Sequence, residues 1–223
     1  MRNRGRLTLA IFDLDKTLLS GDSDHAWGEF LVECGLVDGG HYRRENDRYY
    51  EAYQAGELDI TDYLRFALRP LAEHDLSELQ GWRQQFMRKK ILPMITPAAR
   101  ALVTRHRDQG HTLVIITSTN DFIAAPIANE FNIPHLIASQ AELRAGRYTG
   151  QFVGTPCYRH GKVERLRAWA QERGENLVDS WCYSDSHNDL PLLELVEHPV
   201  AVNPDEILRA RAESLGWPIL SLH

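Results

Sequence analysis

The chain has 223 residues, 43% of them hydrophobic, and a formal net charge of −6. This composition suffices for one large domain or a core with an inserted subdomain, and the lack of a long basic tract argues against nucleic-acid binding. The basic start MRNRGR precedes an apolar run too short for a signal peptide or a membrane span. Three scattered cysteines argue against a disulfide scaffold or a zinc site: Cys34, Cys157 and Cys182. We therefore expect a cytoplasmic protein with neither a nucleic-acid nor a membrane partner.

The first predicted element is a buried parallel strand from Leu7 to Phe12. Asp13-Leu14-Asp15-Lys16-Thr17 follows it directly, and uncompensated charge beside a core disfavours folding, so the segment indicates a functional site. Residues two apart in extended backbone point the same way, which lets Asp13 and Asp15 face one reacting centre. The carboxyl end of such a strand is also where open α/β sheets bind ligands. A solvated strand end is the alternative for an isolated pair of this kind.

A long helical stretch comes next. Helices are predicted at about Asp24–Cys34, Tyr42–Ala55, Asp59–Leu68 and Asp75–Lys90, with no convincing strand among them. Residues 20–92 are far too many for an ordinary connection between strands. The sequence therefore predicts a helical cap at 20–92, inserted into a core formed by 1–19 and 93–223.

From residue 93 onward, helices alternate with apolar strands. Predicted helices are Thr96–Gln109, Asp121–Phe131 with a kink at Pro126, Gly161–Arg173, Leu190–Val196 and Pro204–Leu215. Predicted strands are His111–Ile116, His135–Ala138, Leu177–Tyr183, Pro199–Val202 and an edge strand at Trp217–Leu220, with a hairpin from Ala141 to Val153 that turns at Ala145-Gly146. This alternation predicts an α/β fold with a doubly wound, Rossmann-like parallel sheet.

Polar residues gather where the predicted strands end, and each suits a part of phosphoryl transfer. Asp13 can attack phosphorus as a nucleophile, and Asp15 can act as general acid and then as general base. Oxygen atoms of Asp13, of the Asp15 backbone carbonyl and of Asp185 form a ligand set suited to Mg²⁺. The sequence thus predicts a metal-assisted reaction at these carboxylates.

Three further positions complete the predicted site. The Thr117 hydroxyl can donate to a phosphate oxygen or cap the following helix, and the two roles are compatible. Lys162 opposes the dipole of the helix that it begins, which favours a specific partner such as phosphate together with Asp189. Asn188 can bind phosphate or close its turn, and Asp189 can orient Lys162 without binding the metal directly.

In their order and contexts, the segments FDLDKT, Thr117, Lys162 and SDSHNDLPLL resemble the motifs of the haloacid dehalogenase superfamily. The last segment is similar to that of phosphoserine-phosphatase-like members, which carry a helical cap and include some histidinol-phosphate phosphatases. The resemblance covers the core, and implies a Mg²⁺-dependent phosphatase that acts on small phosphomonoesters through an aspartyl-phosphate, with Ser118 as a further substrate-binding residue. The segment Thr117-Ser118-Thr119-Asn120 departs from the S-G-G-F of phosphoserine phosphatases, and its bulkier side chains disfavour phosphoserine.

The substrate prediction depends on Asp22, at the position where phosphoserine phosphatases place a glutamate that meets the substrate ammonium. Asp22, with Asp24 nearby, can bind an amine, or Asp22 can simply cap a helix. Candidate pocket aromatics, which can equally form a helix core, are Trp27, Phe30, Tyr49, Tyr50 and Tyr53. Histidinol phosphate fits best because it has an amine and an imidazole but no carboxylate.

The sequence also fits other functions. Phosphoserine would need an arginine for its carboxylate, and Arg65 or Arg69 could serve. Another small-metabolite phosphatase, or a phosphotransferase, would use the same motifs. A non-enzymatic phosphoprotein-binding module is disfavoured because every chemical motif is intact. The oligomeric state cannot be predicted from the sequence.

Overall fold

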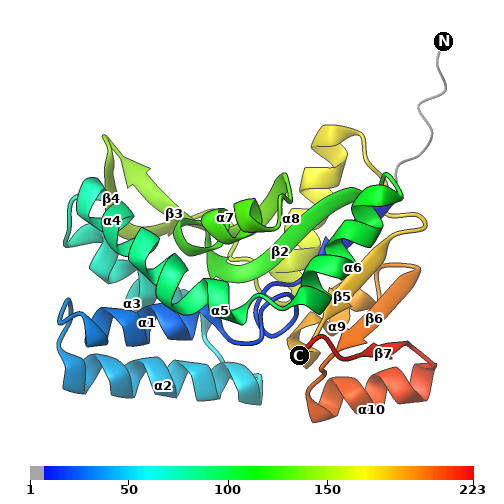
Figure 1. The fold of residues 1–223 in the computed structure, drawn as a ribbon, viewed down its shortest axis with the longest axis horizontal. Coiled ribbons are helices and arrows are strands. Elements are labelled where there is room, and N and C mark those ends of the chain that lie inside the picture. Colours follow the sequence, from blue (N-terminus) through cyan, green and yellow to red (C-terminus); the bar gives the residue numbers. More distant parts are fainter. Residues whose placement is uncertain (1–7) are drawn as a thin grey trace.

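The computed structural model describes residues 8–223, so Leu7, the predicted start of the first strand, lies outside the described range. The fold is built on a seven-stranded sheet with the order β4-β3-β2-β1-β5-β6-β7 (Figure 1). Its strands are β1 Leu9–Phe12, β2 Thr112–Asn120, β3 His135–Arg144, β4 Arg147–Val153, β5 Trp181–Ser184, β6 His198–Val202 and β7 Ile219–Leu220. All neighbours pair in parallel except β3 and β4, which are antiparallel. The predicted fold class is confirmed.

Helices cover both faces of this sheet, as alternation along its strands requires. Ala10 and Phe12 of β1 pack into a core that includes α6 Pro97–Asp108 and α7 Asp121–Glu130. Leu9 and Ile11 face the other way, into a second core. The helices on that side are α8 His160–Arg173, α9 Leu190–Leu193 and α10 Glu206–Leu215. β1 is the central strand of the sheet and both of its faces are buried. The polar segment that begins at Asp13 follows its carboxyl end.

The helices between β1 and β2 lie together at one side of the sheet and pack against it (Figure 1). They are α1 Ser23–Glu33, α2 Gly39–Ala55, α3 Ile60–Ala72, α4 Leu76–Phe86, a π-helical turn Met87–Ile91 and α5 Leu92–Met94. No strand lies among these described residues, and the chain leaves and re-enters the core side by side, where Leu19 bridges Ile95. This arrangement supports our proposal that residues 20–92 act as a cap.

Several helix and strand boundaries differ from the prediction. The predicted helix Asp75–Lys90 is interrupted by the π-helical turn, and β5 begins only at Trp181 instead of Leu177. The third strand and the first arm of the hairpin are one strand, β3, and the turn at Ala145-Gly146 lies where predicted, with φ of 47° and 79°. β2 continues to Asn120, so Thr117 lies within a strand that changes register after it.

Pro126 lies inside α7 without ending it. Proline has no N–H, so the carbonyl of Phe122, four residues earlier, has no partner within the helix. Nη1 of Arg83, on α4, donates to that carbonyl oxygen at 2.8 Å, and the guanidinium lies over the Phe122 ring. A side chain from the helical insertion therefore satisfies the backbone of a core helix.

Candidate active site

The predicted site residues meet at the carboxyl ends of the central strands. The backbone N–H of Asp13 donates to the Tyr183 carbonyl at 2.9 Å, which extends the pairing of β1 and β5 by one residue. Asp185 follows β5, and Thr117 lies near the end of β2 on the other side of β1. Three neighbouring strands thus bring these side chains to one edge of the sheet, as open α/β sheets do at their ligand sites.

A buried lysine is shared between two buried carboxylates. Nζ of Lys162 donates to Oδ1 of Asp13 at 2.8 Å and to Oδ2 of Asp189 at 2.7 Å. These three residues are only 1–3% exposed. Burial alone would lower the pKa of Lys162, but the two carboxylates outweigh it and hold that pKa well above its ordinary value. The lysine is therefore charged and fixed beside Asp13, with Asp189 as its anchor.

Asp13 and Asp185 approach each other around Thr17. The Thr17 hydroxyl donates to Oδ1 of Asp185 at 3.1 Å and lies 3.5 Å from Oδ2 of Asp13. Burial raises the pKa of Asp13 to about 7 against the lowering effect of Lys162, and burial together with the neighbouring carboxylates raises the pKa of Asp185 well above its ordinary value. Three carboxylates and one lysine leave negative charge uncompensated, and oxygen donors with excess negative charge fit a hard divalent cation.

Asp15 lies apart from the lysine, against the start of the helical insertion. Its Oδ1 accepts from the Ser23 backbone N–H at 2.6 Å, and its Oδ2 accepts from the Thr119 hydroxyl at 2.7 Å. Burial, followed by the charge of Asp22, raises the pKa of Asp15 to about 6. A carboxyl group that titrates near neutrality can both give and take a proton, which suits a general acid and base.

The segment after Thr117 takes roles that the sequence left open. The Thr117 hydroxyl oxygen accepts from the backbone N–H of Thr119 at 3.2 Å. The N-cap of α7 is Asn120, whose side chain accepts from Ile123, so the capping role considered for Thr117 was wrong. Ser118 lines the pocket described below, and Thr119 holds Asp15. The phosphate-binding roles of Thr117 and Ser118 stay predictions.

Asn188 is occupied by the protein itself. Its Oδ1 accepts from the Tyr158 hydroxyl at 3.0 Å and from Nε of Arg159 at 2.9 Å, while its Nδ2 donates to the Tyr53 carbonyl at 3.0 Å. These contacts tie the end of α2 to the core. The geometry therefore favours a structural role for Asn188, and its predicted contact with substrate stays untested.

A pocket opens between the strand ends and the helical insertion. Four aspartates line it, namely Asp13, Asp15, Asp22 and Asp24, and so do four tyrosines, namely Tyr49, Tyr50, Tyr53 and Tyr63. Within the described range 8–223, no arginine or lysine lines the pocket. Arg65 and Arg69, considered above for a substrate carboxylate, are exposed on the surface of α3. The pocket is thus acidic and aromatic.

The residues predicted from the helices divide between this pocket and the core. The Asp22 carboxylate accepts from the His25 backbone N–H at 2.8 Å as the N-cap of α1, and it also lines the pocket, so both interpretations fit its position. Trp27 and Phe30 stack on each other in the core, with ring centroids 5.5 Å apart. The three predicted tyrosines line the pocket instead.

Sequence reasoning missed several pocket residues, namely His25, Asn46, Tyr63 and Thr119, and considered Asp24 only together with Asp22 as a possible amine-binding residue. A signal existed for Asn46, because it lies three and seven residues before Tyr49 and Tyr53, on one face of α2. Its amide packs flat against Gly28 of α1, where an added Cβ would lie 2.5 Å from Oδ1. Thr119 gave no such signal, since its contact with Asp15 depends on β2 continuing past Thr117.

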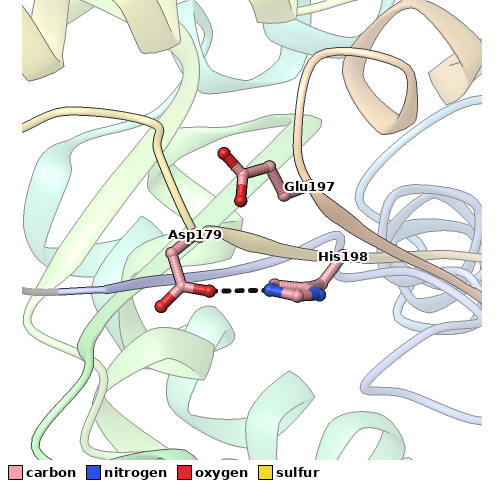
Figure 2. Close-up of side chains that lie close together, drawn as sticks. All are labelled: Asp179, Glu197 and His198. Atoms are coloured by element: carbon pink, nitrogen blue, oxygen red, sulfur yellow. Dashed lines mark hydrogen bonds and ion pairs between the residues drawn. The ribbon is translucent and has the colours of Figure 1, made fainter.

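A second group of potential metal ligands lies at the opposite, amino ends of β5 and β6. Figure 2 shows Asp179, Glu197 and His198 close together, with Oδ1 of Asp179 hydrogen-bonded to Nε2 of His198 at 2.7 Å. Both carboxylates are exposed, and the histidine already has a partner. We assign no metal to this surface ion pair.

Within residues 8–223, no helix is long and apolar enough to cross a membrane.

Residues 10–194 match the model of the family described as haloacid dehalogenase-like hydrolase. The chain belongs to this family. A histidinol-phosphatase of Neisseria meningitidis serogroup C is 47% identical over 217 residues, which cover 96% of this chain and 98% of that protein. A crystal structure of a Bordetella pertussis protein of unknown function is 43% identical with a TM-score of 0.92, covering 98% of this chain and 100% of that one.

More distant proteins that resemble this haloacid dehalogenase-like hydrolase include phosphoserine phosphatases. A substrate-bound phosphoserine phosphatase superposes with a TM-score of 0.72 at 18% identity, covering 99% of this chain and 95% of that one, which shows the shared fold. The protein is a phosphatase of the family, and family members generally use a divalent metal.

Proposed function

We propose that this phosphatase hydrolyses histidinol phosphate in a Mg²⁺-dependent reaction through an aspartyl-phosphate at Asp13. The observation that carries the proposal is the acidic, tyrosine-lined pocket without an arginine or lysine in its described walls. Histidinol phosphate offers an ammonium group and an imidazole to such walls, while phosphoserine would bring a carboxylate among like charges. The name of the Neisseria relative, at 47% identity over nearly its whole length, supports the same substrate.

The proposed chemistry has two steps. A carboxylate oxygen of Asp13 attacks phosphorus, the bond from phosphorus to the ester oxygen breaks, and Asp15 gives its proton to the departing alkoxide, which leaves as the alcohol. Asp15 then takes a proton from water, whose oxygen attacks the phosphorus of the aspartyl-phosphate and releases phosphate. The second step restores the Asp13 carboxylate and the protonated Asp15.

Charge on the phosphoryl oxygens has to be balanced throughout. Lys162 lies 2.8 Å from Asp13 and is placed to meet these oxygens, with Thr117 on the neighbouring strand as a hydroxyl donor. Asp13, the Asp15 carbonyl and Asp185 would hold Mg²⁺, which fits the uncompensated charge of this cluster. When bound, the ion supplies positive charge that lets carboxylates and a phosphate dianion approach each other.

A substrate comparison tests the proposed function. Purified protein with Mg²⁺ is assayed for phosphate release from histidinol phosphate, phosphoserine, serinol phosphate and p-nitrophenyl phosphate. We expect kcat/KM to be at least about tenfold higher for histidinol phosphate than for phosphoserine, because a like-charge contact costs several kcal/mol and about 1.4 kcal/mol corresponds to a factor of ten. A preference for phosphoserine would contradict the proposal. Transfer to an added alcohol in place of phosphate release would favour a phosphotransferase.

The nucleophile is tested separately. Asp13→Asn should abolish turnover of every ester, because an amide is not a competent nucleophile, while far-UV circular dichroism remains native. Beryllofluoride, which mimics an aspartyl-phosphate, should inhibit the unmodified enzyme when Mg²⁺ is present. A folded Asp13→Asn protein with near-normal activity would rule out the covalent intermediate.

A further inference from the structure

Asp22 and Asp24 differ in how their charges are balanced, although one residue separates them. The carboxylate of Asp22 caps α1, and the pKa of Asp22 is raised by burial but lowered in part by Lys16 and His25. Lys16 also lies over the Tyr50 ring, with Nζ 4.7 Å from its centroid. Asp22 forms no ion pair within residues 8–223, but the Lys16 charge lowers its pKa in part, whereas no cation does so for Asp24.

Asp24 has only neutral partners. Its side chain is buried, with the residue 9% exposed, and its Oδ1 accepts from Nδ2 of Asn120 at 3.2 Å. The Tyr63 hydroxyl partly lowers the pKa of Asp24. Asp24 takes part in no ion pair with a residue of the described range 8–223. Burial, followed by the charges of Asp22 and Asp15, raises its pKa well above the ordinary value. A buried carboxylate in this position gains most from a further N–H donor.

The pocket provides the place for such a donor. Asp24 lines it beside Tyr63, and Tyr49 and Tyr53 face the same space from α2. Tyrosine walls suit a flat aromatic ring, through stacking or through the cation–π contact of a charged one. The acceptor and the ring-binding walls therefore belong to one part of the pocket, and the ammonium acceptor Asp22 lies next to it.

We propose that Asp24 is a specificity-determining residue that accepts a hydrogen bond from an imidazole N–H of the substrate, while Asp22 meets the ammonium group. This inference rests on the proposed function and divides the substrate between two carboxylates. Asn120 orients the Asp24 carboxylate through its hydrogen bond. The substrate class is thus a phosphate ester with two separate nitrogen groups, one of them in an aromatic ring.

Inhibition by the dephosphorylated alcohols tests this division without requiring turnover of the proposed substrate. Histidinol carries the amine and the ring, whereas serinol carries the amine alone, and each is measured as an inhibitor of p-nitrophenyl phosphate hydrolysis. Asp24→Asn should weaken inhibition by histidinol by about tenfold to a hundredfold, the effect of a charged hydrogen bond, and change inhibition by serinol much less. Asp22→Asn should weaken both. Asp38→Asn, the same substitution at the exposed N-cap of α2, should change neither.

The kinetic pattern gives a second readout. For histidinol phosphate, Asp24→Asn should act mainly on KM, because the contact is made in the ground state and the transition state alike. Tyr63→Phe, which keeps the ring but removes the hydroxyl that lowers the pKa of Asp24, should produce a smaller change in the same direction. It provides the test if Asp24→Asn fails to fold by circular dichroism.

Two results would overturn the inference. One is an equal loss of inhibition by histidinol and serinol in Asp24→Asn, which would make Asp24 structural. The other is unchanged inhibition by histidinol in that folded variant. Failure of the proposed function looks different, because it appears as a preference of the unmodified enzyme for phosphoserine over histidinol phosphate.

Discussion

At the scale of single residues, the two aspartates near the end of β5 have different surroundings. Oδ2 of Asp189 accepts from both Lys162 and the Ser184 hydroxyl, while the Asp185 carboxylate faces Thr17 and the nucleophile. The carboxylates of Asp185 and Asp13 share the Thr17 hydroxyl, whereas Asp189 reaches Asp13 only through Lys162. This difference supports our proposal that Asp185 binds the ion and Asp189 holds the lysine.

This difference should be visible in metal dependence. We expect Asp185→Ala to raise the Mg²⁺ concentration needed for half-maximal activity by more than Asp189→Asn does, because only the first removes a proposed ligand. Titration of p-nitrophenyl phosphate hydrolysis with Mg²⁺ measures it. Calcium should inhibit, since its larger and more flexible coordination suits in-line attack poorly. Equal metal dependence in the two variants would contradict this assignment.

The sequence indicates a site residue where its charge follows an apolar strand, but it does not show partners that lie far along the chain. Asp13, Asp15 and Asp185 follow apolar strands, where their charge is conspicuous, and the structure brings them to one edge of the sheet. The partners of Asn188 come from α2 and from the segment before α8, so nothing near it in the sequence shows that its amide is occupied. The sequence suggested Asp24 only as a companion of Asp22 in amine binding, and its burial against Asn120 is what distinguishes the two.

At the scale of elements, periodicity predicted the strands and most helices, whereas boundaries depended on contacts across the fold. Val114, Ile115 and Ile116 reveal β2, but Thr117 to Asn120 are polar, and they remain in the strand because β3 pairs beside them. The π-helical turn at Met87–Ile91 had no sequence signal among its basic residues. Pro126 predicted a kink or the end of the first helical turn, and α7 continues through it.

The contact between Arg83 and α7 accounts for that continuation and can be measured as a coupling. Arg83→Met should lower the free energy of unfolding by about 1–3 kcal/mol, because the buried Phe122 carbonyl loses its donor. In the Pro126→Ala background the backbone N–H is restored, so the same substitution should cost less. Urea denaturation of the four proteins of this double-mutant cycle gives the coupling energy. Additive effects would show that the guanidinium does not replace the missing N–H.

At the scale of the whole molecule, a buried histidine on the α6 side of the sheet links folding to pH. His106 is 1% exposed, and its Nε2 is 2.7 Å from the Tyr183 hydroxyl. Its Nδ1 lies 2.8 Å from Nδ1 of His111, so the two rings cannot both be protonated on these atoms. Burial, followed by the charges of His111 and Arg105, lowers the pKa of His106 from 6.5 to about 4.

His106 makes the folded protein less stable as the pH falls. Between pH 6.5 and about 4, the unfolded chain takes up a proton on His106 that the folded chain refuses, so acid favours unfolding across this window. The buried active-site carboxyl groups, with raised pKa values, act in the opposite direction. We therefore expect His106→Phe to change the slope of unfolding free energy against pH, making the protein less sensitive to acid than the unmodified one. Parallel slopes would show that His106 contributes nothing.

The central position of β1 has a consequence for how the enzyme is made. Leu9 pairs with Thr112 and Ala10 pairs with Trp181, so β1 is synthesised well before both of its neighbours in the sheet. Pairings this distant along the chain form slowly and leave strand edges open in the meantime. A nascent chain that has not yet reached β5 lacks the Tyr183 carbonyl that holds Asp13, and lacks Asp185 as well. If Asp13 and Asp185 have the proposed roles, we expect nascent chains that end before β5 to lack phosphatase activity.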